Sequence, residues 1–229
     1  MSKTQMIGSL PSKVLGLLAD LMHKLQHGVI TVRELELFLQ RKDPFKILDT
    51  RSEWQEFYRK YFRIRVDFTN VQIPDDPGGF DRAIFIPKGL KIHDVIKVMR
   101  KAFGVWSFNY YELENEIVKN IRQSDRNYAI RLRELVEADE EIKNLLANPL
   151  KQQGVNCITL LERLVYELKY LSETGQHPDV QNFTLCAGSR DYRGRVPYVG
   201  WNADSGTLRI DLCDLTSADG NLRARQVVS

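Results

Sequence analysis

The sequence predicts an α+β fold in which a helical and mixed N-terminal extension, residues 1–127, precedes a domain of short antiparallel strands, residues 128–229. Three observations lead to this prediction. Capping signals followed by apolar residues at helical spacing recur in the first sixty residues and again after residue 158. Short apolar runs separated by turn residues fill the chain after residue 179. Between these regions helical and strand patterns alternate, which is typical of α+β proteins.

The first sixty residues are expected to form three amphipathic helices. The first covers about residues 11–26, with an apolar stripe at three- and four-residue steps. Thr31 with Glu34, and Thr50 with Glu53, have the spacing of a capping box and predict the starts of the other two helices. The third carries an aromatic stripe that we interpret as helix packing rather than base stacking: Trp54, Phe57, Tyr58, Tyr61 and Phe62.

The next elements are expected to follow the order β-β-α-β-α. They are a strand over 64–68, a strand over 83–86, a helix over 92–103, a strand over 105–108 and a helix over 113–121. The polar run 123–127 is the predicted linker, and a strand over 128–133 opens the C-terminal domain. The acidic residues that follow are expected to complement the dipole at the start of a helix ended by Asn148-Pro149; they are Glu134, Glu137, Asp139, Glu140 and Glu141.

The strongest local signal is a helix over residues 160–175. Thr159 and Glu162 form a capping box, and Gly175 can take the left-handed conformation that ends a helix. Its apolar face is expected to pack against the C-terminal strands; that face consists of Leu161, Leu164, Val165, Leu168 and Leu171.

The end of the chain is expected to form a four-stranded antiparallel meander. The strands are placed at 184–187, 197–201, 208–212 and 222–228, with Gly- and Asp-containing turns between them. Arg223 and Arg225 lie two residues apart, so both point to the same side of the last strand. We expect one of them to hold this strand to acidic or carbonyl groups, because a terminal strand frays unless it is held.

Composition is that of a globular chain able to bury a core, with 43% hydrophobic residues and a net charge of +3. Residues 1–127 carry 21 Lys and Arg against 16 Asp and Glu, a net of +5, which leaves nucleic-acid binding open without favouring it. No apolar run reaches the length of a membrane span, and no secretory signal pattern is seen. Cys157, Cys186 and Cys213 are expected to be reduced core thiols in a cytoplasmic protein.

Sequence motifs indicate no catalytic, cofactor or metal site. The chain has no Gly-x-Gly-x-x-Gly, phosphate-loop, His-Glu-x-x-His or Gly-x-Ser-x-Gly motif. His23 and His27 share a helix face but lack a third metal ligand. Cys186 or Ser189 with His177 would pair a nucleophile with a base, although neither lies in a recognisable motif. The motifs therefore predict no cofactor and no metal, while residues distant in sequence could still assemble a catalytic site in the folded chain.

The C-terminal hundred residues resemble a known protein class. The resemblance lies in Ile158–Arg163, Glu167–Tyr170, Glu173–Gly175, Thr184–Arg190, Val196-Pro197, Trp201 and the ending Leu222–Ser229. These segments resemble mostly uncharacterised bacterial proteins whose C-terminal domain is similar to the variable proteins of diversity-generating retroelements. The resemblance implies a C-type-lectin-like fold that binds a protein or another macromolecular ligand without catalysis. It also implies sequence diversification of the last strands and loops. It covers roughly residues 128–229 and assigns no function to residues 1–127.

The resemblance places the binding surface on the last strands and loops. Calcium-dependent lectins use a Trp-Asn-Asp run, whereas here Trp201-Asn202-Ala203-Asp204 contains an insertion and the paired cysteines of extracellular lectins are missing, so we expect no calcium–sugar site. The residues expected on the binding face are Asp191, Tyr192, Tyr198, Val199, Trp201, Asn202, Asp204, Arg209, Asp211 and Asp214. Alternation along a strand should turn some of these residues toward the core, and Tyr198 and Trp201 are the first candidates for a core position instead of the binding face.

Two alternative functions remain open. The first is nucleic-acid association through two basic clusters, for which a solvated surface is the simpler interpretation; the clusters are Arg59, Lys60, Arg63, Arg65 and Lys97, Arg100, Lys101. The second is an enzyme with an unrecognised site near Cys186, His177 or the acidic run.

Overall fold

A computed structural model describes residues 12–39, 50–108, 113–142, 154–214 and 220–229. The chain divides into two compact units, residues 1–49 and 50–229. The predicted boundary between residues 127 and 128 does not coincide with this division. Strand β1 of the expected extension pairs along its length with β4 of the expected C-terminal domain, so one core joins the two. In every described helix, the length or the polarity is incompatible with a membrane span.

The described residues of the first unit form two helices. Helix α2 covers Ser12–Gln26 and helix α3 covers Val32–Leu39. Gly28 takes the left-handed conformation, with φ of 68°, in the turn between them. The predicted capping box at the start of α3 is confirmed: Glu34 accepts from the Thr31 amide at 2.6 Å, and Thr31 Oγ1 accepts from the Glu34 amide at 3.2 Å.

The second unit is α+β, as the sequence predicted, and it contains mixed sheets. The helical elements among its described residues are α4 (Thr50–Tyr61), α5 (Ile92–Met99), α6 (Leu113–Glu116), η1 (Glu140–Ile142) and α8 (Leu160–Thr174). Its strands are β1 (Arg82–Ile86), β2 (Gly104–Ser107), β3 (Lys119–Asn120), β4 (Tyr128–Leu132), β5 (Phe183–Leu185), β6 (Ser189–Arg190), β7 (Val196–Asn202), β8 (Thr207–Cys213), β9 (Leu222–Ala224) and β10 (Val227–Val228).

Three sheets form from strands that are distant in sequence. The largest has the order β2-β8-β7-β5-β9, the second β1-β4-β10, and β3 pairs with β6. The expected hairpin of β7 and β8 is present and antiparallel. The expected antiparallel pairing of β5 with β7 is also present. The predicted place of the last strand is wrong, because β9 joins β5 in parallel, and β2 joins β8 in parallel as a strand that the meander did not include. The predicted last strand is divided into β9 and β10, which belong to different sheets.

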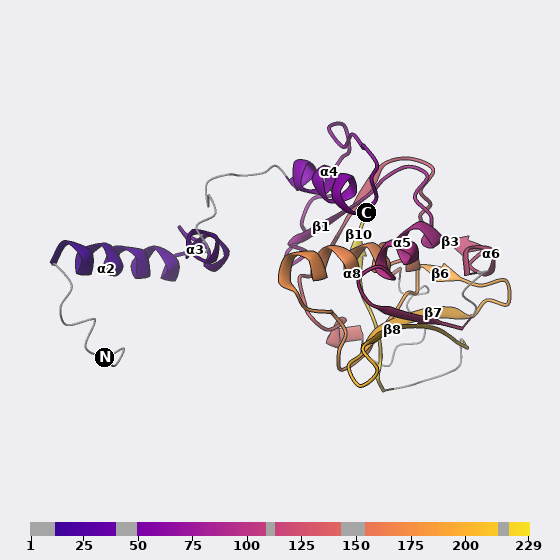
Figure 1. Cartoon of the computed structure of the whole chain (residues 1–229). Coiled ribbons are helices and arrows are strands. Elements are labelled where there is room, and N and C mark those ends of the chain that lie inside the picture. The colour runs from indigo at the N-terminus through magenta and orange to yellow at the C-terminus, as the bar shows by residue number, and fades with distance from the viewer. Residues whose placement is uncertain (1–11, 40–49, 109–112, 143–153, 215–219) are drawn as a thin grey trace. The chain divides into compact units, whose positions relative to one another are not determined.

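Helix α8 lies between the sheet that contains β7 and β8 and the strand β1, and α5 also packs against it (Figure 1). Its capping box is confirmed, with Glu162 accepting from the Thr159 amide at 2.8 Å, and Gly175 ends the helix with φ of 72°. Leu164, Val165 and Leu168 of the predicted face are buried. Leu161 and Leu171 are only partly covered, and the polar side of the helix is buried as well.

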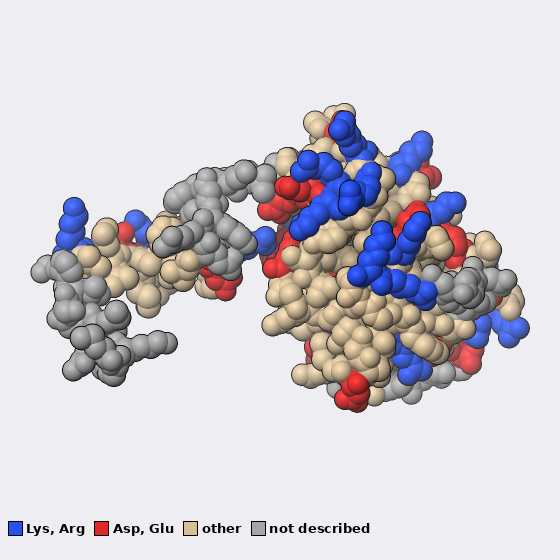
Figure 2. Space-filling model, viewed as in Figure 1, with Lys and Arg blue, Asp and Glu red and all other residues tan. Residues whose placement is uncertain are grey.

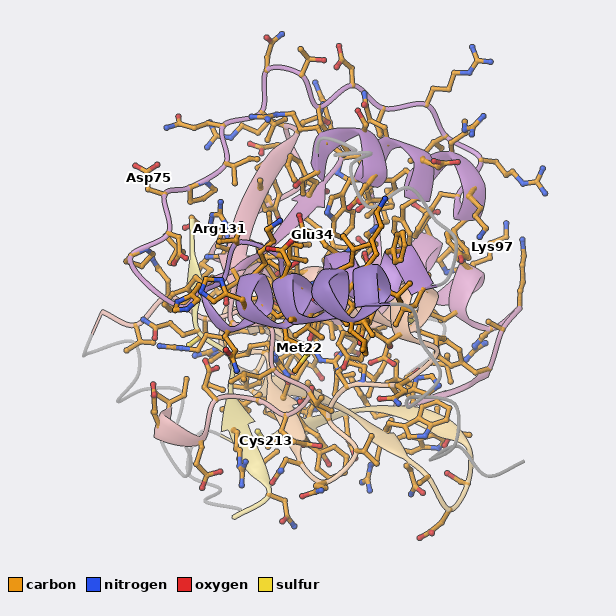
Figure 3. All side chains as sticks on the ribbon, turned by 90° about the vertical axis from the view of Figure 1, so that its left-hand side faces the viewer. Met22, Glu34, Asp75, Lys97, Arg131 and Cys213 are labelled. Carbon is orange, nitrogen blue, oxygen red and sulfur yellow. The ribbon has the colours of Figure 1, made fainter. Side chains whose placement is uncertain are left out.

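Several segments predicted from local patterns differ from the structure because side chains hold their backbone. Residues 64–68 form no strand, since the carbonyls of Val66 and Asp67 accept from Gln55 and Asn127. The predicted linker 123–127 is a packed turn in which Ser124 Oγ donates to the Leu90 carbonyl. The loop 74–81 is fixed to β4 by Arg131, whose Nε donates to the Pro74 carbonyl at 2.6 Å (Figure 3).

Two predicted helices also require correction. The one expected over 113–121 ends at Glu116, because the following residues pair with β6 and the Ile121 amide donates to the Gly188 carbonyl. The acidic run 134–141 contains only the short element η1, and the remainder of the predicted helix to Asn148-Pro149 lies outside the described residues.

Truncation of Leu168 tests the role of α8. Leu168→Ala removes a side chain that is 3% exposed, and we expect the free energy of unfolding to fall by about 2–5 kcal/mol, because the cavity adds to the lost burial. Leu171→Ala on the same helix is the matched control and should cost less than half as much, since Leu171 is already partly solvated. Chemical denaturation measures both. Equal costs at the two positions would contradict the described packing of α8.

Candidate functional site

The five-stranded sheet has one face against the core and one that is partly open. Val199, Leu208 and Ile210 are fully buried in the core cluster that includes α8. Side chains alternate along a strand, so the neighbours of these residues point to the opposite face. These neighbours are Tyr198, Arg209 and Asp211. We call this opposite face the outer face of the sheet.

A compact group of four side chains occupies the open part of the outer face. The registers place Trp106 beside Arg209 and Asp211 beside Tyr198, across the adjacent strands β2, β8 and β7. Asp211 Oδ2 accepts from Arg209 Nη2 at 2.7 Å and from the Tyr198 hydroxyl at 3.1 Å. The Arg209 guanidinium lies 5.4 Å from the Trp106 ring centroid and 5.9 Å from that of Tyr198. We call Trp106, Tyr198, Arg209 and Asp211 the outer-face cluster.

The cluster combines exposure with fixed geometry. Trp106 is 49% exposed, and the Arg209 side chain is 44% exposed, so both can contact a ligand. Partial burial, together with the neighbouring Asp211 carboxylate, raises the pKa of Tyr198 to about 12, so its hydroxyl stays neutral and donates. Hydrogen bonding to Asp211 raises the pKa of Arg209 from an already high value. At neutral pH the cluster therefore presents a held guanidinium between two aromatic rings.

Phe183 adjoins the cluster on β5. Its ring packs over Gly200, where a Cβ atom would lie 2.5 Å from Phe183 Cδ1, and meets the Tyr198 ring edge-on at 5.4 Å. Gly200 therefore leaves the space that the Phe183 ring occupies beside Tyr198. The stretch of sheet surface next to Arg209 is apolar as a result.

Of the residues predicted on the binding face, three belong to the outer-face cluster: Tyr198, Arg209 and Asp211. Tyr192, Asp204 and Asp214 are exposed in turns and loops, and Asn202 is exposed at the end of β7. Asn202 Oδ1 accepts from the Ser205 amide at 3.1 Å and thereby shapes the β7–β8 turn. The five polar residues from Asn202 to Asp214 are therefore not one uniformly exposed group, since Arg209 and Asp211 are paired and half-buried.

Three predicted face residues point elsewhere. Val199 is fully buried in the core. Trp201 is on the core side of β7, with its ring stacked on His177 at 3.4 Å between centroids. Asp191 is 1% exposed, and its carboxylate accepts from the Arg193 and Arg195 amides and from Arg195 Nε. The Asp191 carboxylate is buried and makes its hydrogen bonds within its own turn, so it cannot contact a ligand.

Sequence reasoning missed Trp106. The alternating pattern of residues 105–108 did predict a strand there, but nothing local indicates that this strand pairs in parallel with β8, a hundred residues away. Because residues 1–127 were expected to form a separate extension, no residue before 128 was considered for the binding face.

A buried ion network lies on the core side of the sheet. Arg163 bonds Glu167 at 2.8 Å and Asp179 at 2.8 Å, and Asp179 bonds Arg225 at 2.9 Å. All four side chains are fully buried. Thr184 on β5 donates a short hydrogen bond to Asp179. The network connects α8 to the sheet and to the chain end.

Asp179 also fixes the backbone around it. Its amide donates to the Val136 carbonyl and its carbonyl accepts from the Trp201 amide, both at 2.9 Å. Its φ of 56° is unusual for a residue with a side chain, so the contacts hold a strained conformation. Arg225 donates to the Leu135 carbonyl at 3.0 Å, and Arg223 pairs with Glu140 at 2.5 Å. The expectation that these arginines hold the terminal strand is confirmed.

The residues considered for catalysis have structural partners. Burial raises the pKa of the Cys186 thiol far above its ordinary value, which disfavours the thiolate nucleophile. Ser189 Oγ accepts from the Leu160 amide and lies 2.6 Å from Asn120 Oδ1. His177 Nδ1 lies 2.6 Å from Glu167 Oε1. The hydrogen bonds of Cys186 and Ser189 thus go to structural partners, the Thr184 carbonyl in the first case and Leu160 and Asn120 in the second.

The acidic run is a set of individual structural contacts rather than a helix start. Glu137 accepts from the amides of Val180, Gln181 and Asn182 at 3.1 Å. The other carboxylates pair with arginines: Glu134 with Arg82, Asp139 and Glu141 with Arg133, and Glu140 with Arg223. The dipole interpretation is therefore wrong for Glu134, Glu137 and Asp139. Glu140 and Glu141 lie in the first turn of η1, and the helix predicted to follow lies outside the described residues. Across the described parts of the chain, no group of three or more His, Cys, Asp or Glu residues is arranged to hold a metal ion.

The two predicted basic clusters lie in the second unit and are exposed. Lys and Arg side chains gather over α4 and α5 on the face shown in Figure 2, and Lys97 projects from α5 in Figure 3. Arg59 is paired with Glu56 at 3.3 Å. Acidic side chains are interspersed among them in Figure 2, so the surface is basic without being uniformly so.

Comparisons with family models, curated proteins and solved structures found no match to this chain.

Replacement of Asp179 tests the buried network. Asp179→Asn leaves Arg163 and Arg225 without their shared carboxylate, and we expect a loss of about 3–5 kcal/mol in the free energy of unfolding at pH 7. The control is Asp204→Asn in the exposed β7–β8 turn, which should change stability by no more than about 0.5 kcal/mol. If the free energy of unfolding fell no more for Asp179→Asn than for Asp204→Asn, the buried network would not contribute to stability.

The same pair of proteins gives a pH test with a definite sign. Burial alone would raise the pKa of Asp179, but Arg225 and Arg163 outweigh it, so the folded-state pKa is below its ordinary value. The stabilisation is therefore complete above the unfolded pKa, about 3.9, and is lost as the pH falls through the folded pKa. The stability difference between the parent and Asp179→Asn should be constant near neutrality and shrink below about pH 4.

Proposed function

We propose that this chain is a non-catalytic binding protein whose C-terminal part presents the outer face of the five-stranded sheet to a protein ligand. The observation that carries the proposal is the outer-face cluster. Trp, Tyr and Arg are the residue types that most often dominate binding energy at protein interfaces. Here one of each lies on three adjacent strands of one sheet.

The cluster is held in place before any ligand arrives. Asp211 orients Arg209 and Tyr198 through the two hydrogen bonds given above, and strand pairing fixes the position of Trp106 beside Arg209. Ordering long side chains on binding costs free energy, so a guanidinium already fixed between aromatic rings loses less. The sheet beneath is in turn attached to α8 through the Asp179 network.

The proposal agrees with the class that the C-terminal residues resemble. We infer a C-type-lectin-like domain of the kind found in variable proteins of diversity-generating retroelements, acting in the cytoplasm. The cluster residues Tyr198, Arg209 and Asp211 lie in the part of the chain where that class carries its diversified positions. A neighbouring reverse-transcriptase gene, with an imperfect repeat of the last coding segment that differs at adenines, would support the assignment directly.

Nucleic-acid binding is the second candidate, favoured by the exposed basic side chains over α4 and α5 (Figure 2). Such binding would depend on phosphate contacts and would weaken steeply as salt rises. It would also be independent of the outer-face cluster, so the experiment below separates the two candidates.

Paired variants test the proposed binding face. The full chain is used to capture partners from its source cells, the partner is purified, and the dissociation constant is measured by calorimetry. Trp106→Ala and Arg209→Ala should each weaken binding by about thirtyfold or more, as expected for a hot-spot loss of about 2 kcal/mol. The control Ile121→Ala removes another exposed apolar side chain and should leave affinity unchanged within about twofold.

Two results would contradict the proposal. One is a protein partner whose affinity is the same for all three variants and the parent. The other is a nucleic-acid partner whose affinity falls steeply with salt, is unaffected at Trp106 and Arg209, and is reduced by Lys97→Ala with Lys101→Ala.

A further inference from the structure

The first unit exposes an unusual amount of apolar surface. Among residues 13–36, 38 and 39, none is buried. Half of the exposed large hydrophobic residues of the described chain lie in these two helices and their turn, at exposures from 44% to 70%; they are Leu15, Leu17, Leu18, Met22, Val29, Val32, Phe38 and Leu39. The other half are spread over the much longer second unit. Monomeric proteins rarely leave contiguous apolar surface of this kind open.

The exposed residues of α2 follow helical spacing. Leu15, Leu18 and Met22 are separated by three and four residues and therefore form one stripe along the helix, and Met22 is visible on α2 in Figure 3. The apolar face of α2 is only partly covered: Leu21 and Leu25, on the adjoining side, are half-buried, while the stripe of Leu15, Leu18 and Met22 is open.

The first unit, residues 1–49, is close to the size at which a chain needs additional stabilisation. Below roughly 40 residues a disulfide, a metal or oligomerisation is usually required, because too little surface is buried. All three cysteines lie after residue 156, so no disulfide can form within residues 1–49. The described part of this unit also contains no group of residues arranged to hold a metal. Coverage of its apolar surface by another folded surface is the remaining means.

Charge is compatible with association between identical copies. Helix α2 carries Lys13 and Lys24 against Asp20, a net of +1, and α3 carries Glu34 and Glu36 against Arg33, a net of −1. A two-fold arrangement that places α2 of one copy on α3 of the other brings opposite net charges together. If all eight large side chains, at 44–70% exposure, were covered, they would offer on the order of 800 Å² per copy, which is what a stable interface buries from each partner.

We propose that α2 and α3 associate with the same helices of a second copy, so that the chain is a homodimer joined through its N-terminal unit as a four-helix bundle. Antiparallel helix pairs from two chains bury their apolar stripes in this arrangement. The inference is independent of the proposed binding function.

The experiment measures the mass of the full chain in solution by sedimentation equilibrium. The parent should have twice the mass of one chain, and Leu18→Glu with Met22→Glu should halve it, because two carboxylates would enter the interface. The matched control replaces two equally exposed apolar residues of the second unit, Val118→Glu with Ile121→Glu, and should remain dimeric.

A second measurement tests the inference without the Glu variants, in case these fail to fold. Met22→Cys keeps an apolar side chain on the exposed stripe, and mild oxidation should yield a covalent dimer far more efficiently than Val118→Cys does. A parent that is monomeric at every attainable concentration overturns the inference, as does a dimer that survives Leu18→Glu with Met22→Glu. A monomeric parent overturns the inference also where the second unit of the same chain, or a different protein, covers the stripe.

Discussion

The buried charge shared by Arg163, Asp179 and Arg225 is the interaction on which the second unit depends. Two arginines without exposure would be very costly if unpaired, so the single carboxylate between them must be in place whenever the unit is folded. Asp179 follows α8, Thr184 lies on β5 and Arg225 lies between β9 and β10. One carboxylate therefore joins the helix, the sheet and the chain end.

The network fixes how α8 and the sheet are arranged more than it adds to the free energy of unfolding. A buried ion pair is often no more stabilising than apolar side chains of the same volume, but its geometry tolerates few alternatives. Here the backbone of Asp179 is bonded to residues 136 and 201, so the position of β7 relative to α8 follows from where the charges meet. A sheet held in this way on its core side can present fixed side chains on its outer face, which is what the proposed binding function requires. If the N-terminal helices associate as inferred, a dimer would offer two such faces, and binding to a repeated ligand would gain in avidity.

Local patterns predicted much of the secondary structure. The capping box at Thr159 and Glu162 and the glycine after the helix were sufficient for α8, because both act within a few residues. The β7–β8 hairpin followed in the same way from alternation and a turn. The parallel pairs of β2 with β8 and of β5 with β9 were not predictable, since strand pairing depends on contacts across the whole chain. Helix α8 also carries charged residues on its buried side, which a hydrophobic pattern assigns to solvent.

Only part of the binding face was predicted, because part of it depends on long-range strand pairing. Tyr198, Arg209 and Asp211 were included because they lie on the last strands, whereas Trp106 reaches the same face only through long-range pairing. Asp191 and Val199 were included wrongly: burial of a turn carboxylate and the side to which a strand residue points both depend on the assembled sheet. The boundary at residue 127 was placed in a polar run that the fold uses as a packed turn.

Amide hydrogen exchange on the full chain tests most directly the claim that α8 and the sheet form one cooperative unit built on Asp179. The amides of α8, β4 and the β7–β8 hairpin should share the slowest exchange rates and open together as denaturant is added, since the network connects them. An outer hairpin that exchanges orders of magnitude faster than α8, with its own separate opening, would contradict the account, because a mobile sheet could not hold the outer-face cluster in place.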